Sequence, residues 1–385
     1  MISHIRTYFT HSRSVAVGGV FVSMGFLFGN WVTLIPHVKA KFNLDDAQLG
    51  LLLLSMPFAS TLMNPFTTLI INRFGMRKAT IYGLLALAVT YALPVNMPYL
   101  WLTALSLAAV GMSLATTNVA MNTCVTAIEQ HEGLNIMSTS HGMFSAGGML
   151  GAALASTLIG LQIPVSVHTT VASALILGLT FIIKPFVLGI YEEKTQTSEG
   201  AKFAWPNRIL VGMIAISLCT NITEGTMADW TAVFMREVVK TDDFFIGWAF
   251  SCYALLMAAG RFAGDWLIPK YGTKRILIGG GLVSAAGILL AVLQPHTFTS
   301  IAGFGLVGAG VSCAAPILYG SAARTPGMAK GAGLATMNTF SIAGFLAGPA
   351  LIGFISKAAN LSLAIGLIAG LGLLWAFLTS RVKLY

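Results

Sequence analysis

Two carboxylic acids stand inside a long apolar stretch of this chain. Glu224 and Asp229 lie within residues 208–235, where most side chains are apolar. A carboxyl group that is kept from water favours its protonated form, so it can bind a proton and release it when its surroundings become wetter. Because ionisable groups inside apolar spans are functional by default, we expect both acids to be proton-coupling residues. The alternative for Glu224 is an acid that only ties its helix to a neighbour.

The spacing of the two acids gives them different surroundings. Asp229 follows Glu224 by five residues, which in a helix is roughly 7.5 Å and about 500° of turn. The two carboxyl groups therefore point about 140° apart, and they do not both face one cavity squarely. Asp229 is thus also a candidate for a gate residue near the outer end of its span, or for an acid that water reaches there.

Several uncharged polar residues also lie within apolar stretches. Asn118 and Asn122 are spaced i,i+4, so their amides share one helix face and suit a hydroxylated or other neutral polar solute. Hydrogen bonding between helices is an equally good reading, since Asn commonly does this in membranes. The predicted substrate cavity comprises Asn30, Trp31, Asn118, Asn122, His141 and Glu224. Trp31 is also consistent with simple packing, and His141 with a water-exposed structural role.

Arg261 and Asp265 form a second i,i+4 pair, near the end of another apolar stretch. Such a pair can stack on one helix face, and we expect it to have a gating or structural role. Substrate binding by Arg261 is the alternative. The run Glu129-Gln130-His131-Glu132 contains metal-binding residue types, but it falls in one short loop and is expected to be solvated.

The chain lacks the patterns typical of enzymes. We find no nucleophile–base constellation, no phosphate-binding glycine loop and no metal-ligand spacing in any polar segment. The glycine-rich stretches lie within apolar runs, where helix formation uses the backbone donors. We therefore expect no catalytic residue, no metal and no cofactor.

The elements that must position these residues are apolar runs of membrane-spanning length. The composition is 56% hydrophobic and 9% charged, against about 25% charged in soluble domains. A span needs about 20 mostly apolar residues, and twelve runs meet this requirement: 15–36, 47–71, 79–97, 99–127, 134–161, 165–186, 208–235, 245–268, 276–294, 298–322, 331–355 and 361–380. This predicts an all-α membrane protein with a six-helix bundle over 1–186, a polar cytoplasmic linker over 187–207 and a second bundle over 208–385.

The distribution of basic residues orients the spans. With an inside N-terminus, 16 of the 22 Lys and Arg fall on the inner side, as the positive-inside rule requires. The net charge of +9 is thereby explained without nucleic acid. We expect a multi-pass protein of the bacterial inner membrane with both termini cytoplasmic, working as a monomer in the lipid bilayer.

The two halves repeat each other at an offset of 196 to 199 residues. An even number of spans in each half preserves their direction across the membrane, as in transporters built from parallel repeats. The matching positions are Asn30-Trp31 with Asp229-Trp230, Asp45-Asp46 with Asp242-Asp243, Leu49-Gly50 with Ile246-Gly247, Phe74-Gly75 with Tyr271-Gly272, Arg77-Lys78 with Lys274-Arg275, and Phe144-Ser145 with Phe340-Ser341.

The loop after the second run resembles the signature of the major facilitator superfamily, G-x-x-x-D-R-x-G-R-K. It contains Asn72, Arg73, Gly75 and Arg77, with Asn72 in place of the Asp and Thr68 in place of the first Gly. The resemblance implies gating or structural roles for these four loop residues. Asn72 can form hydrogen bonds but cannot form the charge pair that an Asp would.

Three shorter stretches resemble the bacterial YbjJ-like group, which is distantly similar to fucose permeases. They begin at Ser140, Glu224 and Gly260. The resemblance implies solute transport across the inner membrane, commonly coupled to protons. Our leading hypothesis is a secondary active transporter (a symporter or similar carrier) that moves a small polar organic solute by alternating access, driven by protons. Two alternatives stay open: a proton-driven exporter of amphipathic compounds, and a passive channel or non-transporting membrane sensor.

Overall fold

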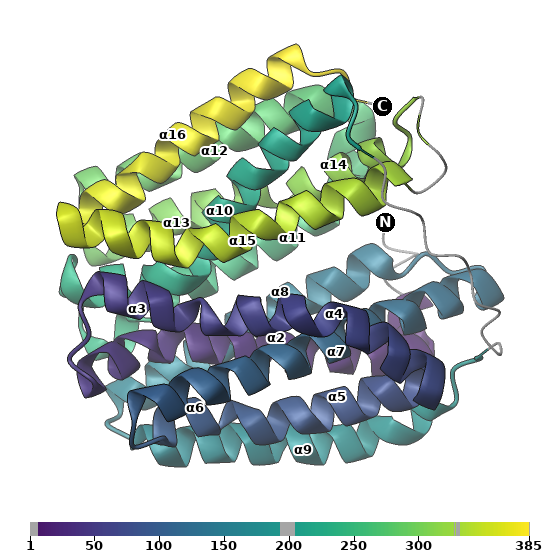
Figure 1. Ribbon diagram of the computed structural model, residues 1–385, viewed down its shortest axis with the longest axis horizontal. Coiled ribbons are helices and arrows are strands. Elements are labelled where there is room, and N and C mark those ends of the chain that lie inside the picture. Colours follow the sequence, from purple (N-terminus) through teal and green to yellow (C-terminus); the bar gives the residue numbers. More distant parts are fainter. Residues whose placement is uncertain (1–6, 193–204, 327, 329–331, 385) are drawn as a thin grey trace. The chain divides into compact units, whose positions relative to one another are not determined.

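The structure is a computed structural model that describes residues 7–192, 205–326, 328 and 332–384, without the side chain of Asp265. These residues form helices and no strand (Figure 1). The helices of the first half are α2 (Ser12–Lys41), α3 (Asp46–Leu53), α4 (Ser55–Phe74), α5 (Met76–Tyr91), α6 (Leu93–Asn96), α7 (Leu100–Glu132), α8 (Met137–Gly160) and α9 (Val165–Leu188). Those of the second half are α10 (Arg208–Glu237), the 3-10 helix η1 (Asp243–Phe245), α11 (Trp248–Tyr271), α12 (Thr273–Leu293), α13 (Thr297–Val311), α14 (Ala314–Ala323), α15 (Ala332–Ala358) and α16 (Leu361–Arg381).

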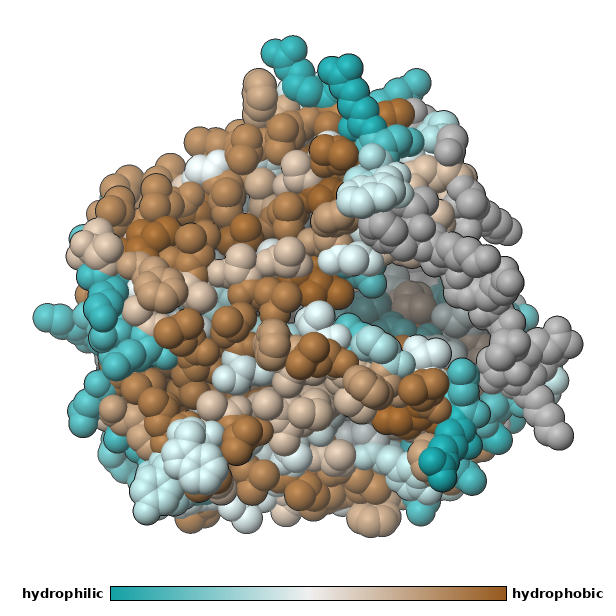
Figure 2. Space-filling view, in the orientation of Figure 1, coloured by the Kyte–Doolittle hydropathy of each residue, from teal (hydrophilic) through white to brown (hydrophobic). Residues whose placement is uncertain are grey.

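Within the described residues, 12 helices are long and apolar enough to cross a membrane, which confirms the predicted count. Several of these spans consist of two consecutive helical pieces. Figure 2 shows apolar side chains over much of the visible face, with hydrophilic residues gathered near helix ends. A surface of this kind is stable where lipid replaces water.

Proline explains one of the breaks within a span. The break between α5 and α6 lies just before Pro94, which occupies the first turn of α6. Proline has no backbone N–H and is tolerated in a first turn, where that donor has no helical partner. The apolar run thus continues while the helix restarts, and α5 and α6 count as one span.

Backbone features of the first half recur in the second half at a constant offset of 197. Gly75 and Gly272 directly precede equivalent helices, with backbone φ angles of 84° and 82°. Residues other than glycine rarely adopt φ angles in this region. A Cβ on Gly111 would collide with the carbonyl oxygen of Met56, and one on Gly308 with that of Tyr253. The predicted repeat is therefore present in the packing of the helices.

The described residues fall into two compact units. The first unit draws on Met1–Leu44, Leu52–Thr195 and Asp242–Ser251. The second unit draws on Asp45–Leu51, Gln196–Thr241 and Cys252–Tyr385. The bundle limits 1–186 and 208–385 remain a prediction, and most of the linker predicted at 187–207 lies outside the described residues.

Each unit thus contains a short segment from the opposite half of the chain, and we call Asp45–Leu51 and Asp242–Ser251 the exchanged segments. In the second unit, a Cβ on Gly50 would lie 2.5 Å from the carbonyl oxygen of Pro349. In the first unit, a Cβ on Gly247 would lie 2.6 Å from that of Ala152. Both pairs obey the offset of 197, so the exchange is symmetric.

Candidate functional site

The second unit gathers an acid, a cationic side chain and two tyrosines. Glu224 on α10 and Arg261 on α11 are both partly exposed. The charge of Arg261 acts on Glu224, and Glu224 acts on the hydroxyl groups of Tyr253 and Tyr319. Because such interactions weaken with distance, these four residues occupy one neighbourhood, which we call the Glu224 cluster.

Hydrogen bonds to α15 position the turn of α10 that precedes Glu224. The hydroxyls of Ser217 and Ser341 lie 2.7 Å apart, and Asn221 Nδ2 donates to the carbonyl of Ser341 at 2.9 Å. Interhelical polar contacts of this kind hold membrane helices in register. Glu224 is therefore presented from a fixed helix.

A carboxyl group beside a guanidinium and two hydroxyls has two chemical uses. It can exchange a proton, because the neighbouring charge and the surrounding dielectric decide whether it ionises. Together with the two hydroxyls, it can also hydrogen-bond a polar solute. Tyr253 and Tyr319 were not among the predicted site residues.

Asp229 lies apart from the Glu224 cluster. It is partly exposed, and within the described residues it has no recorded hydrogen bond or ion pair. The charge of Arg261 is not among the influences on it. The prediction that the carboxyl groups of Glu224 and Asp229 point in different directions is not tested by these observations.

In the first unit, Asn30 is fully buried at the meeting point of four helices. Its Oδ1 accepts from the hydroxyl of Tyr91 on α5 and lies 2.9 Å from Nε2 of His168 on α9. Its Nδ2 donates to the carbonyl of Gly151 on α8 at 3.4 Å. His168 is a buried histidine that the sequence analysis did not single out.

Trp31 is buried in the first unit, beside a cavity of about 10 Å³. This is room for about one water molecule, so the cavity as it stands is too small for an organic solute. Its lining is apolar apart from the polar atoms of Trp31 and Tyr91: Leu27, Phe28, Trp31, Met56, Leu87, Tyr91, Pro94, Leu107, Val110 and Leu114.

Asn118 and Asn122 pair with each other on α7. Asn122 Nδ2 donates to the carbonyl oxygen of Asn118 at 2.8 Å and to its Oδ1 at 3.0 Å. Asn118 is exposed, and within the described residues neither amide bonds to another helix. The amides are thus accessible to a ligand, while their role in a substrate cavity remains a prediction.

His141, at the start of α8, is partly buried and packs edge-on against Phe21 with ring centroids 5.3 Å apart. Its carbonyl accepts from the hydroxyl of Ser145. This contact joins the start of α8 to α2, and a role of His141 in the substrate cavity remains a prediction.

The loop between α4 and α5 is tied down within the first unit. Arg77 Nε donates to Glu192 Oε2 at 2.7 Å, and Nη1 donates to the carbonyl oxygens of Leu188 and Ile190 at 2.6 and 3.2 Å. A Cβ on Gly75 would lie 2.6 Å from the carboxylate of Glu192. These contacts therefore fasten the start of α5 to the segment of chain that follows α9.

Arg73 and Asn72 lie at the exposed end of α4. The guanidinium of Arg73 lies 5.5 Å from the ring centre of Phe74. The predicted pairing of Arg261 with Asp265 falls on a side chain outside the described residues.

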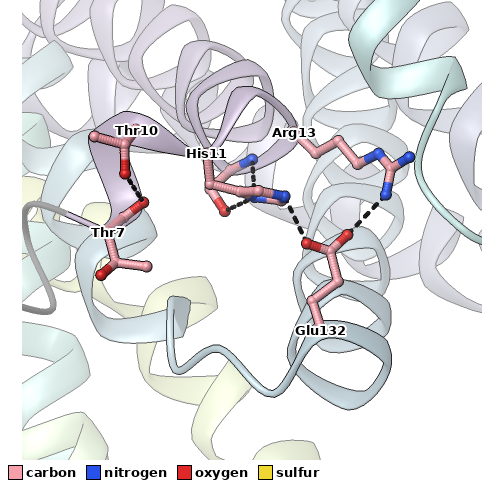
Figure 3. A network of polar contacts seen from close by, with 6 residues as sticks. Thr7, Thr10, His11, Arg13 and Glu132 are labelled. Carbon is pink, nitrogen blue, oxygen red and sulfur yellow. Dashed lines mark hydrogen bonds and ion pairs between the residues drawn. The ribbon is translucent and has the colours of Figure 1, made fainter.

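The expectation that Glu129–Glu132 is merely solvated was wrong. Glu129 Oε1 accepts from the backbone N–H groups of Ile136 and Met137 at 2.7 and 2.8 Å, which caps the start of α8. Glu132 lies 2.5 Å from His11 Nε2 and 2.9 Å from Arg13 Nη1, as Figure 3 shows. These side chains therefore fasten α2 and α8 to the end of α7.

An open apolar groove of about 710 Å³ runs between α4 and α7 in the first unit. Its lining is apolar apart from the polar atoms of Ser55 and Trp101: Ser55, Phe58, Ala59, Leu62, Met63, Phe66, Trp101, Ala104, Leu105, Ala108 and Met112. Many of these side chains are about half exposed.

Comparison with known proteins places the chain in a family. The Major Facilitator Superfamily profile matches residues 16–239 and 209–383. An uncharacterized MFS-type transporter of Yersinia pestis is 33% identical over 360 residues, covering 93% of this chain and 92% of that protein.

Two solved structures share the fold at low sequence identity. The nucleoside transporter NupG has a TM-score of 0.71 at 13% identity, covering 95% of this chain and 98% of that one. The E. coli fucose:proton symporter FucP has a TM-score of 0.65 at 14% identity, covering 96% and 98%. The profile match and the Yersinia relative together carry the assignment: this chain is a multi-pass membrane transporter, not an enzyme, and it belongs to the Major Facilitator Superfamily.

Proposed function

We propose that this transporter moves a small polar organic solute across the bacterial inner membrane by alternating access, coupled to protons at Glu224. The observation that carries the proposal is the Glu224 cluster: the charge of Arg261 acts on Glu224, a partly exposed residue, and the hydroxyls of Tyr253 and Tyr319 belong to the same neighbourhood. An acidic side chain inside a membrane span has a high free-energy cost, so it is taken to be functional by default.

The first six spans contain no acid in their interiors, so proton binding by a carboxyl group falls to the second half. Arg261 favours the ionised form of Glu224, and removal from water favours its protonated form. A change in solvent access therefore changes the proton occupancy of Glu224. Coupling follows if the solute binds only one of the two protonation states.

The hydroxyls of Tyr253 and Tyr319 in the second unit favour a neutral, hydroxylated solute, and in the first unit the amides of Asn118 and Asn122 would suit the same class of solute. Hydroxyl and amide groups both donate and accept hydrogen bonds, as sugar-like ligands do. The solutes named for the structural relatives, a nucleoside and fucose, belong to this chemical class.

Alternating access also needs contacts that can be released and re-formed. The exchanged segments carry such contacts within each unit. Asp45 pairs with Lys357 at 2.9 Å and Asp46 accepts from the hydroxyl of Ser356, and Ser156 Oγ donates to the carbonyl of Phe244 at 2.6 Å. The ion pair of Asp45 with Lys357 is exposed and therefore individually weak, which suits a reversible step.

The membrane orientation remains part of the proposal. Both termini are placed in the cytoplasm by the charge asymmetry, and the chain works as a monomer, as is typical of its superfamily. Labelling of single cysteines introduced at Lys78 and Lys41 is expected to place these positions on the inner and outer sides, respectively.

The direct test is gradient-driven uptake in proteoliposomes, with solutes chosen by melting-temperature shifts over a library of sugars, nucleosides and organic acids. A proton gradient is expected to drive uptake by the natural protein. Glu224→Gln is expected to abolish the dependence on the gradient while the protein stays folded. The matched control is Glu237→Gln, the same change at an exposed position of the same helix, which is expected to transport normally. Full gradient-driven uptake by Glu224→Gln would remove this residue from the mechanism.

The groove between α4 and α7 favours a second candidate function, export of amphipathic compounds. Its lining of Phe, Leu, Met and Trp side chains suits the apolar part of such a compound, since cofactor and drug sites are mostly apolar. The same reconstituted protein separates the two functions. Proton-driven expulsion of lipophilic cations or dyes, with no uptake of hydroxylated solutes, would favour the exporter.

A further inference from the structure

Basic side chains gather where α11, α12 and α16 meet in the second unit. Lys274 Nζ donates to the carbonyl oxygen of Ser380 at 2.7 Å, which places the start of α12 beside the end of α16. Four exposed residues occupy this corner, and we call them the basic rim: Lys270, Lys274, Arg275 and Arg381.

Exposed aromatic rings accompany the basic rim. Lys270 Nζ lies 4.6 Å from the ring centre of Trp266 and 5.2 Å from that of Tyr271. Arg381 lies 5.4 Å from the ring centre of Phe377. Trp and Tyr collect where a membrane meets water, at the level of the lipid headgroups. The corner therefore combines a headgroup-level position with concentrated positive charge.

The corresponding corners of the two repeats differ in the partner of one basic side chain. At the equivalent corner of the first unit, Arg77 donates to the carboxylate of Glu192. Lys274 stands 197 residues after Arg77 and bonds to a backbone carbonyl instead. Within the described residues, no member of the basic rim pairs with a carboxylate; the side chain of Asp265 lies outside that description. Among the side chains that the structure describes, the first unit supplies an anion at this corner and the second supplies none.

We propose that the basic rim binds the phosphate of an anionic phospholipid, which takes the place that Glu192 has in the first unit. Clusters of Lys and Arg at the ends of membrane helices attract anionic headgroups. The neighbouring rings of Trp266 and Tyr271 fit the interfacial region between headgroup and acyl chains. The inference does not depend on the transported solute or on Glu224.

The experiment compares lipids added to the purified full-length protein in a neutral detergent. Phosphatidylglycerol is expected to raise the melting temperature more than phosphatidylcholine does. The double variant Arg275→Gln/Arg381→Gln is expected to lose most of this difference, and native mass spectrometry is expected to show binding weakened by about tenfold or more. The matched control, Arg236→Gln/Lys240→Gln, removes the same charge at exposed positions away from the rim and is expected to behave like the natural protein.

Two results would overturn the proposal: an undiminished preference for phosphatidylglycerol in the double variant, or none in the natural protein. Glycerol phosphate distinguishes the source of the phosphate. An equal melting shift from this free anion would mean that no lipid is needed, and would contradict the assignment. If the double variant melts lower in phosphatidylcholine alone, the single variant Lys270→Gln answers the same question with the same readouts.

Discussion

Nε2 of His168 lies 2.9 Å from Oδ1 of Asn30, and the same oxygen accepts from the hydroxyl of Tyr91. One buried amide therefore receives donors from α9 and α5, and its own Nδ2 reaches α8. Because Asn30 is itself on α2, this side chain joins four helices of the first unit. Removal of the amide would leave two buried donors without an acceptor.

We expect Asn30→Leu to destabilise the protein by about 2–3 kcal/mol, since each stranded buried polar group costs roughly 1–3 kcal/mol. The measurement is the apparent melting temperature in detergent. Asn118→Leu removes an amide that bonds only within its own helix, and it serves as the control with little expected change. An unchanged melting temperature for Asn30→Leu would show that the network contributes nothing to stability.

The contact between α2 and α8 gives a second stability prediction. A Cβ on Gly29 would collide with the carbonyl oxygen of Gly148, which is backbone and cannot rotate away. Gly29→Ala is therefore expected to lower stability by about 1–3 kcal/mol, as in other overpacked sites. Gly178 has nothing within 4 Å of an added Cβ, so Gly178→Ala is expected to be neutral or stabilising by up to about 1 kcal/mol. Equal melting temperatures for the two variants would contradict the close approach of α2 and α8.

The ion pair of Asp45 with Lys357 gives a prediction about pH. The hydrogen bond from Lys357 lowers the pKa of Asp45 below its ordinary value of 3.8. The hydrogen bond from the backbone N–H of Gln48 to the Asp45 carboxylate lowers this pKa further. A lowered pKa in the folded state means that the stabilisation is present above that ordinary value and is lost only as the pH falls through the lowered pKa. The pair therefore stays intact between about pH 5 and pH 8.

Asp45→Asn should accordingly leave the midpoint of the pH dependence of transport unchanged over this range. The measurement is initial uptake by proteoliposomes at a series of pH values, beside the natural protein. A displaced midpoint in Asp45→Asn would mean that the exchanged segment takes part in proton coupling. This result would contradict the assignment of proton coupling to Glu224 alone.

The spans and the repeat could be predicted because lipid imposes strong rules on a sequence. Apolar runs of about 20 residues are necessary to cross a bilayer, and the part of the chain that the structure describes contains 12 such helices. The repeat could be predicted from short motifs because positions such as Gly75 and Gly272 need the same unusual φ. Each of these features depends on local sequence, which can be read without knowing the packing.

Contacts between distant residues could not be predicted in the same way. His168 lies three residues into its helix, where a histidine facing water is equally consistent with the sequence. Only the packing of α9 against α2 brings it to Asn30. Tyr253 and Tyr319 lie in apolar runs, and nothing in the sequence around them indicates a functional role. Their role is suggested only by the fold, in which Glu224 on α10 lies near them.

The end of α7 shows the same limit. Glu132 is a charged residue in the last turn of a helix, a position that is typical of a solvated side chain. Its partners His11 and Arg13 are more than 100 residues away in sequence, and no local pattern indicates that they meet. Polar residues near helix ends therefore need the fold before their role can be assigned.

The most direct test of proton coupling at Glu224 is solute-induced proton flux. Proteoliposomes with no initial gradient would receive the transported solute while a pH electrode records the outside medium. The natural protein is expected to produce a prompt pH change that a protonophore abolishes, and Glu224→Gln is expected to move the solute without that change or not at all. A pH change of natural size and rate from Glu224→Gln would contradict the account.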